Sequence, residues 1–415
     1  MQSEELLSAV LDLGKAMIVN GAEVWKVEEI LNEICDSYSL SEHDILVLGK
    51  SLQATVQTGD GQLITQIKRI GSTGYDDDKL EKLFKVAHRV LESPVDSKVL
   101  KEQIREITES PGNPFWMTLL GCIISTCSFM LFFNGDIRDI IVTAVLAAAV
   151  QKILRHVMKD LNNAMAANAF AAFDVGLFVL LLAQLGAVRR PGSVITAEIM
   201  LLLSGLGITN GFRNLLHNDV LSGMTDTINA FLGTMGIVIG ITLAMFVVFD
   251  YTRLDVHMQG LTASPVLQIL FCTIACSSCA VIFGAKKKVI LYSAAGTTAT
   301  WCVFLLVSKV IGGGSVLAVL AGAAAAALYS RAIEKLTYIP ETVFLTICIL
   351  PLVPGLQLYY GVLGALISDK ALFLSQFRDL ILTCFSICIG FILVDILCIN
   401  LSQDHRLSRW PAPPL

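Results

Sequence analysis

The chain has 415 residues, of which 54% are hydrophobic and only 16% are charged, and its mean hydropathy is +0.69. Soluble domains carry roughly 25% charged residues, so this composition excludes an ordinary soluble protein and predicts a membrane protein. The net charge of −5, with Lys286–Lys288 as the main basic cluster, argues against a nucleic-acid partner.

Charged residues are concentrated in the first 110 residues, whereas long apolar runs dominate from Phe115 onward. The turn-forming run Ser110–Pro114 separates the two regions. We therefore predict a soluble domain at residues 1–112, a first transmembrane half at 113–255 and a second at 256–415. The chain starts without a basic stretch followed by an apolar one, so we expect no secretory signal and a cytoplasmic N-terminal domain.

The soluble domain is expected to be a small α+β unit. Apolar residues recur at helical spacing in Leu6–Leu13 and again in Val24–Leu31. Two strand-like runs, residues 44–57 and 62–70, are joined by the hairpin turn Gly59–Gly61, and helices are expected at 77–91 and 96–108. The domain has no HExxH, GxSxG or P-loop motif, so we expect a structural or regulatory role and no enzyme activity. A membrane-tethered enzyme is the alternative.

Most of the 11 cysteines lie within apolar runs, where cysteine behaves as a small hydrophobic residue. Cys276 and Cys279 have CxxC spacing, but no βαβ pattern surrounds them, so packing is favoured over a redox or metal role. We therefore expect neither a metal nor a cofactor.

Ten apolar segments are long enough to cross a bilayer as helices of about 20 residues. They are residues 115–134, 137–153, 168–187, 192–209, 225–249, 264–285, 288–309, 312–330, 340–367 and 378–400. Lysine and arginine are more frequent in the loops on the side of the membrane that carries the N-terminus. Because these residues are enriched in cytoplasmic loops, both termini are predicted to be cytoplasmic. Arg189 and Arg190 depart from this rule, because their loop is expected outside.

Ten spans divide into two halves of five, and a repeat with an odd number of spans must be inverted. We therefore predict an all-α polytopic bundle of two inverted five-helix repeats. A glycine-rich interruption, Gly205–Arg213, follows the fourth span, and a Pro-Gly interruption, Pro351–Gly361, lies in the ninth. Broken helices at matching positions indicate a transporter's binding site, with a simple packing kink as the alternative for either one alone.

A polar stripe follows the first interruption. Asp219, Ser222, Asp226 and Asn229 recur at steps of three or four residues, which places them on one helical face. Polar groups in an apolar span are costly, so the stripe predicts a water-filled cavity. An interfacial helix that faces lipid headgroups is the alternative.

Four further ionisable side chains lie in or beside the spans. Arg213 is the expected cationic partner of a substrate carboxylate or of Asp174. Asp174 is also a candidate for proton coupling. Glu198 and Asp395 are carboxylates within spans, for which a proton relay and a helix-packing pair are equal alternatives.

Three motifs resemble the threonine/serine exporter family of bacterial inner-membrane proteins. They are Asn20–Glu29, Arg213–Gly223 and Pro351–Tyr359, and the similarity spans nearly the whole chain. The resemblance implies ten spans, a cytosolic N-terminal domain and efflux of threonine and serine driven by the proton motive force. Some relatives, encoded as two separate halves, are linked to small dicarboxylates. Lys26 stands where arginine is expected, and Asn210-Gly211 where a Pro-Gly pair is commoner.

The sequence thus predicts a secondary exporter of small polar metabolites, whose substrate carboxylate is held by half-helix N-termini at the two interruptions. Small dicarboxylates, an uncoupled channel and a sensor are the alternatives. The expected partners are a small molecule, protons and the lipid bilayer, and the oligomeric state is left open, a homo-oligomer included. The candidate substrate and proton-coupling residues are Asp174, Arg213, Asp219, Ser222, Asp226, Asn229, Pro354, Gly355, Gln357 and Tyr359, and the N-terminal motif adds Gly21, Glu23 and Glu28.

Overall fold

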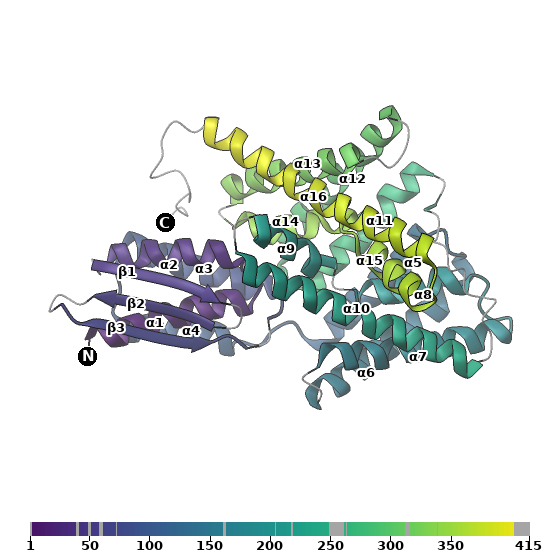
Figure 1. Cartoon of the computed structure of the whole chain (residues 1–415), viewed down its shortest axis with the longest axis horizontal. Coiled ribbons are helices and arrows are strands. Elements are labelled where there is room, and N and C mark those ends of the chain that lie inside the picture. The colour runs from purple at the N-terminus through teal and green to yellow at the C-terminus, as the bar shows by residue number, and fades with distance from the viewer. Residues whose placement is uncertain are drawn as a thin grey trace.

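The computed structural model describes residues 2–38, 41–48, 51–57, 61–71, 73–160, 163–203, 205–216, 219–248, 261–262, 264–311, 316–337 and 339–401. An α+β domain forms one end of the molecule and a large helical domain forms the rest (Figure 1). The two domains join where α4 (Ser97–Glu109) is followed by α5 (Phe115–Phe132).

The small domain packs helices against one face of an antiparallel sheet with strand order β1-β2-β3. Alternate side chains of the central strand, Leu52, Ala54 and Val56, are fully buried, and this strand contacts α1. The predicted helices of this domain are confirmed. The strand-like run at 44–57, however, is two strands, because the chain reverses between the paired residues Leu48 and Ser51. The predicted turn residues Gly59 and Asp60 lie outside the described residues. The remaining elements are α1 (Gln2–Val19), α2 (Val24–Ser37), β1 (Ser41–Leu48), β2 (Ser51–Gln57), β3 (Leu63–Arg69) and α3 (Asp77–Glu92).

The helical domain contains two successive series of six α-helices, and in each series the fourth and fifth helices are short. After α5, the first series continues with η1 (Ile137–Asp139), α6 (Ile140–Asp160), α7 (Ala164–Gln184), α8 (Pro191–Met200), α9 (Gly205–Leu216) and α10 (Val220–Val248). The second series is α11 (Pro265–Ile282), α12 (Lys287–Ile311), α13 (Val316–Thr337), α14 (Glu341–Cys348), η2 (Leu350–Leu352), α15 (Gly355–Leu366) and α16 (Lys370–Leu401).

The predicted polytopic membrane bundle is confirmed. Seven of the described helices are long and apolar enough to span a membrane, namely α5, α7, α10, α11, α12, α13 and α16. The pairs α8–α9 and α14–α15 are each bent by 50° at a short break, and they raise the number to nine if each pair is one span. Helix α6 occupies the predicted span 137–153 but is not among these nine, so the tenth span stays a prediction.

One of the two breaks coincides with a predicted interruption, and the other does not. In the second half, Pro351 lies in η2 and Pro354 immediately precedes α15, as expected from the Pro-Gly motif. In the first half the prediction was wrong, because the glycine-rich segment 205–213 is helical and the turn lies at residues 201–202. Gly205 itself is helical, and its lack of a side chain allows close packing.

The two breaks lie against each other, and their contacts are reciprocal. A Cβ atom added to Gly205 would lie 2.5 Å from Val353 Cγ1 and 3.4 Å from the Cα of Gly355. A Cβ added to Gly355 would lie 3.6 Å from the Cβ of Leu203 and 3.8 Å from the Cα of Gly205. Each break therefore packs on the other through its glycine and through the residue two positions before that glycine.

Equivalent glycines also join equivalent helices in the two halves. A Cβ on Gly240 of α10 would lie 2.3 Å from the carbonyl oxygen of Ala169 in α7. A Cβ on Gly390 of α16 would lie 2.8 Å from the carbonyl oxygen of Leu320 in α13. Small residues at such positions let helix backbones approach closely, which is how helices gain packing energy in lipid.

We expect Gly240→Ala to destabilise the protein by about 1–3 kcal/mol, because the added methyl group meets a backbone oxygen that cannot move alone. Thermal unfolding of the purified protein in detergent measures the effect. Gly233→Ala on the same helix is the matched control, since its Cβ would meet only the side-chain amide of Asn168 at 3.3 Å. Equal losses of stability in the two variants would contradict the proposed backbone contact.

Candidate functional site

A small cavity lies where the two broken spans face the soluble domain. Its volume is about 20 Å³, and it is lined from the first half by α9, from the second half by α14 and α16, and from the soluble domain by the segment before α2. The lining residues are Gly21, Glu23, Leu206, Thr209, Asn210, Arg213, Thr342, Leu345, Thr346, Ile349 and Phe391.

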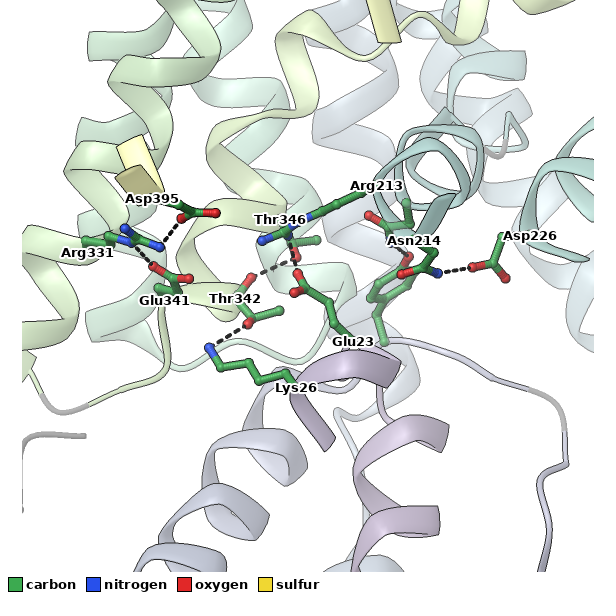
Figure 2. Close-up of polar contacts among 12 residues, drawn as sticks. Glu23, Lys26, Arg213, Asn214, Asp226, Arg331, Glu341, Thr342, Thr346 and Asp395 are labelled. Carbon is green, nitrogen blue, oxygen red and sulfur yellow. Dashed lines mark hydrogen bonds and ion pairs between the residues drawn. The ribbon is translucent and has the colours of Figure 1, made fainter. Parts of the chain in front are cut away.

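A buried ion pair between Arg213 and Glu23 crosses the domain boundary at this cavity (Figure 2). Both side chains are only 10% exposed, and the guanidinium carbon lies 5.0 Å from the centre of the Phe391 ring. Burying two charges costs free energy unless they pair closely, so the two side chains must stay paired in these surroundings. Arg213 therefore pairs with Glu23 and not with Asp174.

The local backbone explains how Glu23 reaches the cavity. Gly21 has a φ of +104°, a left-handed conformation that favours glycine, and it reverses the chain between α1 and α2. Glu23 then occupies the position before the first residue of α2, yet its side chain caps no amide of that helix. Its carboxylate instead points out of the soluble domain towards α9 (Figure 2).

Lys26 makes the corresponding contact with the second half. It lies one turn after Glu23, is 5% exposed, and donates a 3.4 Å hydrogen bond from Nζ to the hydroxyl of Thr342 in α14. The first turn of α2 thus touches both broken spans. Residues three apart share a helical face, which explains why one turn serves both contacts.

A second charged cluster lies beside the cavity within the second half (Figure 2). Arg331 of α13 pairs with Glu341 at the start of α14, at 2.9 Å, and with Asp395 of α16. These contacts join three helices, so the structure favours the packing interpretation for Asp395. Arg331 lies within α13 and not in a loop.

The predicted polar stripe is placed in several different surroundings. Asp219 precedes α10 and accepts a 3.1 Å hydrogen bond from the amide of Ser222, so it caps that helix. Asp226 accepts a 3.0 Å bond from Nδ2 of Asn214, the residue after Arg213. Asn229 is exposed. Of this stripe, Asp226 is therefore the carboxylate that hydrogen-bonds to the helix carrying Arg213.

Other predicted site residues lie away from the cavity lining. Asp174 is half-buried in α7. Pro354 and Gly355 lie at the crossing of the two breaks, and Gln357 and Tyr359 follow in α15, where the ring of Tyr359 is buried.

Glu28 belongs to the soluble domain, where Oε1 accepts a 2.6 Å bond from the amide of Val47. Burial raises the pKa of this carboxyl group. Glu198 is buried in α8, and one of its oxygens has no hydrogen-bond partner among the described residues.

Sequence reasoning missed most of the polar residues that the structure adds to this site. Thr342 and Thr346 were detectable in principle, because residues four apart share one face of a helix. Thr209 carried the same signal, because it lies four residues before Arg213, whereas Asn214 did not. The polar lining residues that the sequence did not select are Thr209, Asn210, Thr342 and Thr346, and Lys26, Asn214 and Glu341 lie beside them.

The cysteines of the CxxC pattern are buried and reduced, and Cys279 lies 3.3 Å from the hydroxyl of Ser125. Across the described ranges, no group of three or more metal-ligating side chains is found. Cys276 and Cys279 are buried where α11 packs on α5.

Comparison with known proteins fits this arrangement. Residues 8–248 match the ThrE family model of threonine/serine exporters, and residues 268–397 match a second model, Threonine/Serine exporter, ThrE. The chain belongs to the threonine/serine exporter family. Within one chain it joins the two regions that the two models describe. No curated protein and no solved structure shows a significant match.

The soluble domain of this exporter-family protein is also held at a second place, the connection between α11 and α12. The amide of Asp77 donates a 2.8 Å bond to the carbonyl of Phe283, and Lys286 pairs with Asp78 at 2.9 Å. Burial raises the pKa of Asp77 well above its ordinary value. Burial also raises the pKa of Asp78, but hydrogen bonds from Lys82 and Lys286 outweigh it, so that pKa is lowered.

These neighbouring aspartates predict opposite effects of neutralisation at pH 8. A raised folded-state pKa means that stability falls as pH rises towards that pKa, so Asp77→Asn raises the melting temperature. A lowered pKa means that stability is present above the unfolded pKa of about 3.9, so Asp78→Asn lowers the melting temperature. Thermal unfolding in detergent between pH 5 and pH 8 measures both, and a shift of the same sign in both variants would contradict the assignment.

Proposed function

We propose that this protein is a secondary active exporter of threonine and serine, coupled to the proton motive force. The observation that carries the proposal is the buried guanidinium of Arg213, which faces a cavity of mixed polar and apolar lining where two broken spans meet. Broken spans place binding sites within a bundle, and an intramembrane charge marks a substrate pathway. Family membership supplies the substrate class.

The chemistry of the lining supports a small amino acid. Arginine recognises carboxylates through two parallel hydrogen bonds. Thr209 and Thr346 offer hydroxyl groups for the ammonium group and the side-chain hydroxyl of the substrate. Leu345 and Phe391 provide apolar walls. Among the described lining residues Arg213 is the one cation, which fits one carboxylate better than the two of a dicarboxylate.

The reciprocal crossing supports a pair of inverted five-span repeats, with α6 as the tenth span. Helices at equivalent places in the two series touch, as in the 3.2 Å hydrogen bond from Ser125 of α5 to the carbonyl of Ala275 in α11, 150 positions later. Inverted repeats that rock about a shared site give alternating access to the two sides of the membrane. In this proposal the soluble domain and both termini face the cytoplasm of a bacterial cell.

Asp226 is the proposed proton-coupling carboxylate. It hydrogen-bonds to Asn214, which directly follows Arg213 in α9, so a change of charge at Asp226 alters the surroundings of the substrate-binding helix. Asp174 is a second candidate, because it is a carboxylate within an apolar span. Coupling requires that protonation changes the relative free energies of the two access states.

We expect a proton gradient to drive movement of labelled threonine in proteoliposomes, and an uncoupler to abolish it. Asp226→Asn is expected to lower gradient-driven transport by about tenfold while threonine exchange without a gradient persists. Asp379→Asn is the matched control, since Asp379 pairs with Arg378 on the exposed surface of α16. Threonine flux that ignores the uncoupler would identify a facilitator and contradict proton coupling.

A further inference from the structure

The soluble domain closes the cavity with a carboxylate of its own. Glu23 is the acidic residue among the described lining residues, and it pairs with the single lining cation, Arg213. With the Glu23 side chain in place, the remaining volume of about 20 Å³ holds about one water molecule. Glu23 therefore occupies space beside Arg213 that the carboxylate of a bound amino acid would need.

Unsatisfied polar atoms mark the same place as a ligand site. Within the described part of the chain, Oε2 of Glu23, Nε of Arg213 and the hydroxyl of Thr209 have no hydrogen-bond partner. Thr209 is 2% exposed and Arg213 is 8% exposed. Buried groups without partners are costly, so three of them around one cavity mark it as a place where water or a polar ligand binds.

We propose that Glu23 occupies the subsite for the substrate α-carboxylate and that the first turn of α2 is a cytoplasmic gate. A substrate carboxylate displaces Glu23 from Arg213, Glu23 leaves the cavity, and the first turn of α2 moves with it. This inference rests on the proposed transport of amino acids, and it adds how the soluble domain regulates access to that site.

The exchange is energetically reversible because one carboxylate replaces another beside Arg213. Removing Glu23 alone would leave Arg213 as a buried, unpaired charge, which is strongly unfavourable. A substrate that brings its own carboxylate removes that cost. The gate thus opens in the presence of a carboxylate ligand and stays closed without one.

The rest of the soluble domain has separate attachments that keep it in place during this exchange. Lys286 pairs with Asp78 and with Glu81, on a different helix from the gate. Lys286 does not line the cavity. These contacts provide a control that weakens docking of the domain without altering the carboxylate subsite.

The test uses the full-length protein in nanodiscs with L-threonine as the probe. We expect Glu23→Gln to bind threonine about tenfold more tightly, because binding no longer has to displace a competing carboxylate. Isothermal titration calorimetry measures the affinity. Lys286→Gln should bind threonine with unchanged affinity, and unchanged or weaker binding by Glu23→Gln would overturn the proposal.

Hydrogen exchange provides a second measurement that needs no variant. Threonine should accelerate exchange of the backbone amides in residues 24–30 of the wild-type protein, and protection of those amides would overturn the gate. If the wild type binds threonine without either effect, the gate fails and the transport proposal stands. If neither protein binds threonine or serine, the proposed function fails and the gate falls with it.

Discussion

The backbone of Gly205 lies against that of Gly355 where the two broken spans cross, and the architecture of the helical domain depends on this contact. A break in a membrane span leaves backbone groups without helical partners, which is tolerated only where protein covers them. Each break here is covered by the other, because neither glycine has a side chain to hold them apart. The crossing also places α9 beside α14 on the side of the soluble domain.

The two sides of the crossing differ in chemistry although their elements correspond. Towards the soluble domain the lining carries Thr209, Arg213 and Thr342. Beyond the crossing, α15 presents the buried rings of Tyr359 and Tyr360, packed edge to face at 5.2 Å. The side towards the soluble domain is therefore polar and charged, and the side beyond the crossing is aromatic.

Local sequence features predicted the elements well, because span length and apolar content are set by the bilayer and not by distant contacts. The break at Pro354 was also predictable from local sequence, because proline disrupts a helix where it stands. The break before Gly205 was misplaced, because this glycine is required by a residue in the other half. A signal that depends on a distant contact is absent from any local window of sequence.

The candidate site shows the same limit. Arg213 was predictable as the cation beside an interruption, although it was expected in a loop and not in a helix, and its partner Glu23 is 190 positions away in another domain. Glu23 was singled out only through a family motif, without a role. Asp174 was selected as an ionisable side chain among apolar residues, but it does not line the cavity. Glu341 and Thr342 follow a proline at a helix start, where polar residues are common and carry little information.

The position of the crossing has a consequence for how such proteins can be divided between genes. Glu23 and Arg213 both lie within residues 8–248, whereas Thr342 and Gly355 lie within residues 268–397. A version of this protein encoded as two polypeptides, cut between α10 and α11, would keep the Glu23–Arg213 pair in one subunit. It would assemble the glycine crossing and the cavity wall only at the interface between the subunits, so neither polypeptide alone would possess a complete site.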